Sequence, residues 1–489
     1  MCGITGIYNP QMTEEENSSL ALRQRVTRMA SSLSSRGPDD NGIFVGDSIA
    51  LGHVRLSILD TSSAGAQPMS LSNTGLTISY NGECYNFPEL RQVLQSQGCV
   101  FSSRSDTEVI LHAYKKWGLQ GLKKLEGIFA LALWDAPKKR LILMRDRLGV
   151  KPLYYGDSIF GLAFGSEIKA VLAAGCLDTS INDQSLSEYM WFGNTHQDRS
   201  FYTGISQLEP GHWLIFEEGL ETVLEPWWRI EEWLDNPLVS SDKSSTTIQV
   251  RDTLDLSVNR QLVSDVPIGL FLSGGIDSSA IAGSVGNSRV KHINTFAAEF
   301  DFSGNSSELS KAALIAKIFD LSHNEIKIYG HDMPSVIHEL AKAHDEPFAD
   351  AANLALYAMC KELPDHIKVV LQGDGGDELF GGYRRYAMLR NAKFWRMCPR
   401  SSSSVIYSLG SNGRRLSRMI DTLGCEDPAV MMALLLTMEN PRLPPERFFT
   451  SEKRNYLRNT TDPFLAYRYA SERFKDYDAV SYTHLTLPT

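Results

Sequence analysis

The feature that most constrains the fold is a glycine- and serine-rich loop between an apolar strand and a helix. Residues 266–272 form an apolar run of strand length, the loop occupies 273–279, and 278–285 has a helical pattern. Val250, Leu254, Val258 and Leu262 repeat every four residues before this run, as on one helix face. Further on we expect strands at 292–300 and 368–372 and a helix at 308–319. Apolar strands that alternate with helices predict an α/β doubly wound parallel sheet.

The loop itself, SGGIDSS, has the chemistry of an anion site. Successive glycines let backbone N–H groups turn toward an anion, and a helix N-terminus adds partial positive charge. Ser273 and Ser278 supply hydroxyl donors. No lysine stands where GxxxxGK[ST] requires one, so this is not a Walker loop. Asp277 would repel a phosphate, so we expect Mg²⁺ to bridge it to the ligand.

A second acidic cluster follows the strand at 368–372. Asp374, Asp377 and Glu378 stand among glycines at 373–382. A solvated turn is one explanation of such a sequence. The other is that these carboxylates lie at the edge of a parallel sheet where ligands bind, and hold Mg²⁺ there.

The first half of the chain has a different pattern. Strands at 127–135 and 140–145 around a turn at 137–139 indicate a hairpin. Ser105 with Glu108 three residues later predicts a capping box, and Gly118 ends that helix. This half is therefore predicted to be α+β with antiparallel sheet. We place the domains at 2–215 and 246–480, with a linker at 216–245 and an atypical tail at 481–489.

Composition excludes several classes. The formal net charge of −10 argues against a nucleic-acid or anionic-membrane surface, and no apolar run reaches the length of a membrane span. Seven cysteines without a CxxC pair favour reduced thiols in the cytoplasm over a disulfide framework or a zinc site. Only Cys2 suggests chemistry. Removal of Met1 would leave a thiol nucleophile and an α-amine base on one residue, unless Cys2 simply has no role.

Taken together, the motifs resemble the glutamine-hydrolysing asparagine synthetase family from Cys2 to about residue 480. SGGIDSS matches the loop of the ATP pyrophosphatases. The first half resembles a class II glutamine amidotransferase, an N-terminal-nucleophile sandwich, in seven segments: 1–6, 36–39, 53–58, 80–83, 105–108, 145–149 and 166–169. The resemblance implies a synthetase domain of the α/β doubly wound type behind that α+β sandwich.

The resemblance assigns roles at a glutamine site. Cys2 would attack the side-chain amide, and the Asn81 side chain with the Gly82 N–H would form the oxyanion hole. Arg55 would bind the α-carboxylate, which suits a planar guanidinium. Glu83 and Asp106 would hold the α-ammonium. Taken singly, Asn81-Gly82 is also typical of a hairpin turn, and Arg55 or Asp106 of a surface ion pair.

The resemblance also implies an ATP site. Asp374 would help form the acyl-adenylate, and Asp277 and Asp377 would bind Mg²⁺. Four positions depart from the usual family residues: Cys84, Ala298, Gln372 and Asp374. The expected ATP-binding residues are Leu272, Ser273, Gly274, Gly275, Asp277, Ser278, Ala298, Gln372 and Gly373.

The implied reaction has two halves. Glutamine is hydrolysed through a Cys2 thioester, aspartate is activated with ATP as β-aspartyl-AMP, and ammonia displaces AMP to give asparagine. We expect a cytoplasmic enzyme and a homodimer. One alternative keeps this machinery but amidates another carboxylate. The other is a glutaminase only, or a non-catalytic relative, since 481–489 does not resemble the family. We expect this end to be a truncation that lacks cations facing pyrophosphate, so that the chain makes little asparagine; the alternative is a genuine short variant.

Overall fold

The structure is a computed structural model of the chain. It describes residues 1–10, 19–196, 198–234, 242–288, 290, 293–301, 307–330, 333–390, 395, 397–398, 400–437 and 439–475. The tail at 481–489, on which the truncation expectation rests, lies outside these residues. Two compact units divide the chain: Met1–Thr179 with Gly204–Leu340 and Asn353–Gly373, and Ser180–Thr203 with Ala341–Ala352 and Asp374–Thr489.

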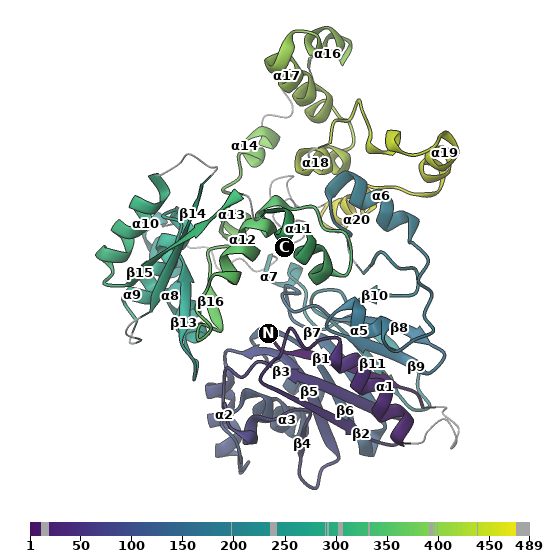
Figure 1. The fold of residues 1–489 in the computed structure, drawn as a ribbon, viewed down its shortest axis with the longest axis vertical. Coiled ribbons are helices and arrows are strands. Elements are labelled where there is room, and N and C mark those ends of the chain that lie inside the picture. Colours follow the sequence, from purple (N-terminus) through teal and green to yellow (C-terminus); the bar gives the residue numbers. More distant parts are fainter. Residues whose placement is uncertain are drawn as a thin grey trace. The chain divides into compact units, whose positions relative to one another are not determined.

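Two six-stranded antiparallel sheets form the first part of the first unit (Figure 1). One has the order β10 (Ser206–Gln207), β8 (Tyr154–Ser158), β9 (Gly161–Gly165), β1 (Gly3–Tyr8), β3 (Ile49–Arg55) and β2 (Asp40–Val45). The other has the order β12 (Val223–Pro226), β11 (His212–Glu217), β7 (Arg140–Arg145), β6 (Gly127–Asp135), β5 (Leu76–Cys84) and β4 (Met69–Leu71).

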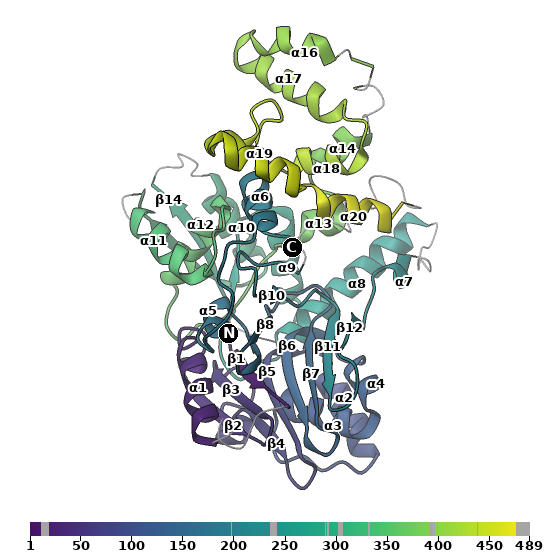
Figure 2. The same ribbon diagram turned by 90° about the vertical axis from the view of Figure 1, so that its right-hand side faces the viewer.

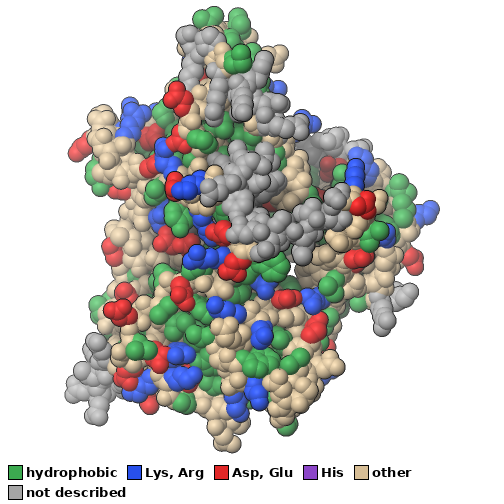
Figure 3. Space-filling view, turned by 180° about the vertical axis from the view of Figure 1, so that it is seen from behind, with side chains coloured by type: hydrophobic (Ala, Val, Ile, Leu, Met, Phe, Trp, Pro, Cys, Tyr) green, Lys and Arg blue, Asp and Glu red, His purple; other side chains and the backbone are tan. Residues whose placement is uncertain are grey.

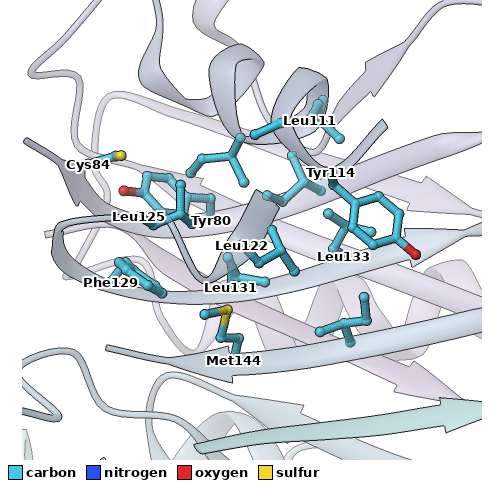
Figure 4. Packing of buried hydrophobic residues seen from close by; sticks show 14 of the residues in the cluster. Tyr80, Cys84, Leu111, Tyr114, Leu122, Leu125, Phe129, Leu131, Leu133 and Met144 are labelled. Atoms are coloured by element: carbon cyan, nitrogen blue, oxygen red, sulfur yellow. The ribbon is translucent and has the colours of Figure 1, made fainter. Parts of the chain in front are cut away.

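Alternation along β6 shows how the layers form. Successive side chains of a strand point to opposite faces. Ala130 and Trp134 therefore pack toward the first sheet, in a core that also holds Ile4. Phe129 and Leu131 pack into the other core, under α2 (Phe87–Ser96), α3 (Asp106–Trp117) and α4 (Leu119–Leu122) (Figure 4).

The first sheet is covered on its outer face as well. Ala30 of α1 (Ser19–Ser31), Leu33 just after this helix and Ala170 of α5 (Ile168–Leu172) form a small core with Val54 of β3. The result is a four-layer α-β-β-α sandwich, which confirms the predicted α+β sandwich of the first half.

The rest of the first unit is built on a parallel sheet of order β15 (Ser322–Ile328), β14 (Asn294–Phe300), β13 (Ile268–Phe271) and β16 (Val369–Leu371). Leu270 faces a core shared with α8 (Lys243–Gln261), α9 (Ile276–Gly286) and α10 (Ser307–Ile318). Phe271 faces the opposite core, to which α11 (Met333–His344) and α12 (Ala351–Lys361) contribute. Helices on both faces confirm the predicted doubly wound sheet.

The second unit is helical where the structure describes it. Its helices are α6 (Asp183–Phe192), α13 (Gly376–Phe380), α14 (Arg384–Arg390), α16 (Arg400–Tyr407), α17 (Gly410–Leu423), α18 (Pro428–Leu436), α19 (Ser451–Thr460) and α20 (Leu465–Arg473) (Figure 2). Phe192 of α6 packs with Tyr467 and Ala433, and the Trp191 Nε1–H donates to Glu446 Oε1 at 2.7 Å.

Several local predictions can be compared with these elements. The hairpin at 127–145 is confirmed as β6 and β7. Ser105 caps α3, but its hydroxyl accepts from Thr107 N, and Glu108 accepts from the N–H groups of Ser102 and Ser103. The capping box was therefore wrong in its bonding. β12 lies within the range 216–245 given to a linker, so ordered sheet continues into that range.

Surface and hydropathy add two observations. Within the described residues, every helix is too short or too polar to cross a bilayer. On the face drawn in Figure 3, Lys and Arg side chains lie interspersed with Asp and Glu.

Candidate active site

The N-terminal strand is held by three contacts from distant segments. β1 lies between β3 and β9. The Ile4 N–H donates to Ser166 Oγ at 3.0 Å, and Arg36 Nε donates to the Cys2 carbonyl at 2.9 Å. Arg36 also pairs with Glu167 at 2.7 Å. Together these contacts from the segments at 36–39 and 166–169 fix the position of the Cys2 backbone.

The Cys2 thiol lies beside the Leu56 carbonyl, among charged groups that include Glu83 and Arg55. Its S–H donates to the Leu56 carbonyl at 3.6 Å, and burial raises the pKa of the thiol. Burial, together with the charges of Arg36 and Lys151 and against an opposing effect of Cys2, lowers the pKa of the chain's α-amine, here on Met1, to about 5. An amine with that pKa is neutral at pH 7, so it can accept a proton. This amine belongs to Met1; the base predicted from the sequence is the α-amine that removal of Met1 would leave on Cys2 itself.

Asn81 offers a hydrogen-bond donor that the fold leaves unused. It lies inside β5 opposite Ala130 and is 1% exposed. Among the described residues, its Nδ2 has no hydrogen-bond partner. A buried donor without a partner is costly, so its retention points to a ligand. The hairpin-turn explanation of Asn81-Gly82 is wrong, because β5 continues to Cys84.

Gly82 is required by close packing. A Cβ at this position would lie 2.2 Å from the Ile128 carbonyl and 2.5 Å from the Phe129 Cα. Both are backbone atoms of the neighbouring strand and cannot move aside cheaply. Glycine alone therefore fits beside Asn81.

Two carboxyl groups, a buried one on Asp106 and a half-buried one on Glu83, follow in the same region. The Asp106 Oδ2 accepts the Cys84 N–H at 2.9 Å, and burial raises the pKa of this carboxyl. Burial also raises the pKa of Glu83 well above its usual value, and the charge of Asp106 raises it further, while Lys151 lowers it. Asp106 is 4% exposed, so its surface ion-pair explanation is wrong. A ligand ammonium would let both groups ionise.

Arg55 is buried and grips a turn. Its Nη1 donates to the Ser62 carbonyl at 3.1 Å, and its Nη2 to those of Leu59 and Asp60 at 3.3 and 2.5 Å. The surface ion-pair explanation is therefore wrong here too. A guanidinium has five N–H donors, so these three bonds leave donors for a carboxylate.

The sequence analysis missed Lys151. Its side chain is 8% exposed, and its Nζ lies 3.0 Å from Met1 Sδ. Burial lowers the pKa of its ammonium, as does the charge of Arg36, while the charges of Glu83 and Cys2 raise that pKa. Asp146 shapes the loop before it by accepting the N–H groups of Lys151, Val150 and Leu148, each at 3.0 Å. The segment 145–149, one of the seven that resemble class II glutamine amidotransferases, lies in this loop but stops two residues before Lys151.

The loop after β13 is built as an anion site would be. The Ser273 and Ser278 hydroxyls lie 3.1 Å apart, and Gly275 stands at the N-cap of α9. In the described part of the chain, no side-chain hydrogen bond caps this helix. Gly274 has φ +73°, and a Cβ there would lie 2.7 Å from Lys311 Cβ. The open helix end and the two hydroxyls fit a phosphate group.

The structure brings the other predicted ATP residues of the first unit to the same edge. A Cβ on Gly373 would lie 2.8 Å from Ser278 N, because β16 pairs with β13. The Leu272 N–H donates to Phe296 O at 2.9 Å, which joins the end of β13 to β14, where Ala298 lies. Gln372 follows β16 directly. Gly373, at which the second glycine-rich segment begins, is thus a neighbour of the loop at 273–279.

Asp374 and Asp377 belong to the second unit. Asp377 lies in α13, and its carbonyl accepts the Gly382 N–H at 2.9 Å. Burial raises the pKa of Asp374, and the charge of Glu378 raises it further. Among the described residues, no three His, Cys, Asp or Glu side chains gather as a metal site. Carboxylates that share Mg²⁺ with phosphate oxygens need no such cluster.

Comparison with known proteins decides the family. A model of the glutamine amidotransferase domain matches residues 1–228, and a model of asparagine synthase matches 249–468. The chain is 32% identical to a putative glutamine-hydrolysing asparagine synthetase 2 of Methanocaldococcus jannaschii, over 82% of this chain and 79% of that protein. The chain belongs to the glutamine-hydrolysing asparagine synthetase family.

Two further members of this group of relatives differ in name. Asparagine synthetase 3 of Bacillus subtilis is 35% identical over 78% of this chain and 63% of its own length. Amidase chyE of Penicillium rubens is 32% identical over 78% of this chain and 59% of its own length. The chain thus spans about three fifths of the length of several curated relatives.

Proposed function

We propose that this asparagine synthetase family member hydrolyses glutamine and uses the ammonia for ATP-dependent amidation of aspartate. The observation that carries the proposal is the buried, unpartnered Nδ2 of Asn81. Glu83, two residues further, is close enough to Cys2 for its charge to raise the pKa of the thiol. An unused donor, a thiol and a base in one region are the parts that acyl transfer needs.

The first half-reaction uses Cys2. Once Met1 has been removed, the Cys2 α-amine takes the proton of the thiol, and the thiolate attacks the side-chain amide carbon of glutamine; a C–S bond forms while the carbonyl oxygen becomes an oxyanion. Asn81 Nδ2 and the Gly82 N–H donate to that oxyanion. The C–N bond then breaks, the nitrogen takes a proton from the α-amine, and ammonia leaves. Water attacks the thioester, giving glutamate and the free thiol.

The second half-reaction belongs to the loops at the sheet edge. The aspartate β-carboxylate would attack the α-phosphorus of ATP, displacing pyrophosphate and forming β-aspartyl-AMP, and ammonia would then displace AMP. The open N-terminus of α9 with Ser273 and Ser278 would hold phosphate oxygens. Asp277 and Asp377 are the donors we propose for Mg²⁺, which supplies positive charge against the phosphates.

A second candidate function keeps the same chemistry with another acceptor carboxylate. The similarity to a protein named amidase chyE favours it, as do Gln372 and Ala298 at positions where the family usually has other residues. A homodimer and a cytoplasmic location stay predictions from the sequence.

Two assays on one preparation test the proposal: glutamate release from glutamine, and pyrophosphate release from ATP with ammonia and aspartate. Cys2→Ala should abolish the first and leave the second intact, because the two reactions use separate sites. Glutamate release near the wild-type rate in Cys2→Ala would refute the nucleophile. Pyrophosphate release that depends on another carboxylate, but not on aspartate, would favour the second candidate.

A further inference from the structure

The two parallel strands that end in the ATP loops both begin against the glutaminase sandwich. Asp265 precedes β13 by three residues: its Oδ2 accepts the Asp60 N–H at 2.8 Å, and its own N–H donates to the Ile58 carbonyl at 3.1 Å. Lys368 precedes β16 by one residue, and its Nζ donates to Asp39 Oδ2 at 2.6 Å. Each strand is therefore anchored on the sandwich at its N-terminal end.

Both anchors reach the same part of the sandwich. The Asp39 Oδ2 that meets Lys368 also accepts the Ser57 N–H at 2.7 Å. Ile58 and Asp60, which meet Asp265, lie one and three residues after Ser57. The segment 57–60 thus touches the starts of β13 and β16 together.

The same segment is part of the glutamine site. Arg55 binds the carbonyl of Asp60, and the Asp60 side chain accepts the N–H groups of Ser62 and Arg104 at 3.3 and 2.7 Å. Arg104 stands two residues before Asp106. The segment that holds the two synthetase strands therefore also contacts Arg55 and the loop just before Asp106.

β13 and β16 are short strands that are hydrogen-bonded side by side. β13 pairs with β16 through Ile268 and Val369, and both strands are fully parallel. Their C-terminal ends carry the loop at 273–279 and Gly373, which pack against each other. Packed strands behave as rigid elements, so a shift at the start of either strand moves the loop at its end.

We propose that Lys368 and Asp265 are positioning residues that couple occupancy of the glutamine site to the ATP loop at 273–279. The inference rests on the proposed function and deepens it. Coupling between two sites is reciprocal, so ATP-site ligands would alter glutamine affinity by the same factor. The physical gain is that ammonia is released when the acceptor site can use it.

Lys368→Gln is the main test, because it removes one anchor and leaves Asp39 bonded to Ser57. The pairs that Arg260 makes with Glu126 at 2.7 Å and Glu89 at 3.0 Å remain and hold α8 on the sandwich. Asp265→Ala removes the other anchor, and Lys368→Arg should preserve the first. Lys361→Gln is the matched control, since it breaks an ion pair with Glu339 at 2.9 Å that lies away from the sandwich.

The first readout is hydrogen exchange of amides in 266–279, with and without saturating L-glutamate as the probe of the glutamine site. Glutamate should slow this exchange in the wild type, in Lys361→Gln and in Lys368→Arg. In Lys368→Gln and Asp265→Ala the slowing should fall by about 5-fold or more, the lower end of typical couplings. The second readout is the ratio of glutamate to pyrophosphate formed, which should rise in the same two variants while each separate half-reaction stays within about 3-fold of the wild type.

The outcomes separate the two proposals. Equal slowing in the wild type and both anchor variants overturns the coupling. A wild type that hydrolyses glutamine but shows no slowing overturns it as well, and leaves the proposed function standing. A wild type that neither hydrolyses glutamine nor binds glutamate overturns the proposed function and the coupling with it.

Discussion

Replacement of Asn81 by alanine should separate catalysis from stability. Nδ2 is buried and unpartnered among the described residues, so the free enzyme gains no hydrogen bond from it. When the oxyanion forms, that donor acquires its partner. Loss of one such donor costs about 2.7–4 kcal/mol of transition-state stabilisation, so kcat for glutamate release should fall about 10²–10³-fold. KM should change little, because the donor acts on charge that develops during the reaction.

The free energy of unfolding of Asn81→Ala should rise slightly or hardly change. A buried unsatisfied donor costs about 1–3 kcal/mol, and Asn81→Ala removes it. The small cavity left by the amide works against this gain. We therefore expect the free energy of unfolding to change by less than about 1 kcal/mol.

Asn86→Ala is the matched control. Its Nδ2 donates to the Lys124 carbonyl at 2.9 Å, and its Oδ1 accepts the Glu126 N–H at 3.0 Å. This substitution should lower stability by about 1–3 kcal/mol, since it orphans both backbone groups. Guanidinium unfolding and steady-state glutamate release measure the two quantities. If Asn81→Ala keeps a third of wild-type kcat, or destabilises as much as Asn86→Ala, the oxyanion assignment is refuted.

Three other substitutions probe separate parts of the chain. Gly82→Ala should cost about 2–4 kcal/mol in denaturant unfolding, because its Cβ would overlap the Ile128 carbonyl; wild-type stability would contradict this. Asp277→Asn should lower aspartate-dependent pyrophosphate release by orders of magnitude and spare glutamate release, and unchanged pyrophosphate release would make its loop a structural turn. Burial raises the pKa of the Glu346 carboxyl to about 7, so the folded state binds the carboxyl proton more tightly than the unfolded state does. The protein therefore loses stability as the pH rises from about 4.5 to 7. Glu346→Gln, which can still accept the Phe201 N–H, should raise Tm by roughly 2–4 °C at pH 8 and hardly at pH 5, and an equal rise at both would refute the burial argument.

Local sequence patterns predicted the elements whose formation depends on alternation, turn residues or helical spacing within the segment itself. The alternation in 127–135 and the turn at 137–139 suffice for a hairpin, and β6 and β7 have the predicted bounds. β15 was missed because its sequence, SHNEIKI, buries only Ile326 and Ile328 and is otherwise polar, as an edge strand can be. The repeat from Val250 to Leu262 marked a helix correctly, although Val250 itself is 43% exposed.

Contacts across the chain could not be predicted in this way. The sequence analysis proposed Arg55 as a ligand for glutamine, but it could not show that the guanidinium also holds three carbonyls at 59–62. Lys151 is 149 residues from Cys2, and only the fold shows that their charges interact. Glu108 turned from its expected helix cap to Ser102 and Ser103 because the loop before α3 brings their N–H groups within reach. In each case tertiary packing decides the partner.

The costs in the glutamine site have a common explanation. The free site keeps an unpartnered amide donor at Asn81, two carboxyl groups whose pKa burial raises at Glu83 and Asp106, and a buried lysine at 151. Each is unfavourable in the empty protein. In the proposed function, the ammonium of bound glutamine would relieve the two carboxyl groups already in the ground state, while the Asn81 donor would gain a partner only when the oxyanion forms. A donor that is satisfied only at that point stabilises the transition state selectively, and such stabilisation is what accelerates a reaction.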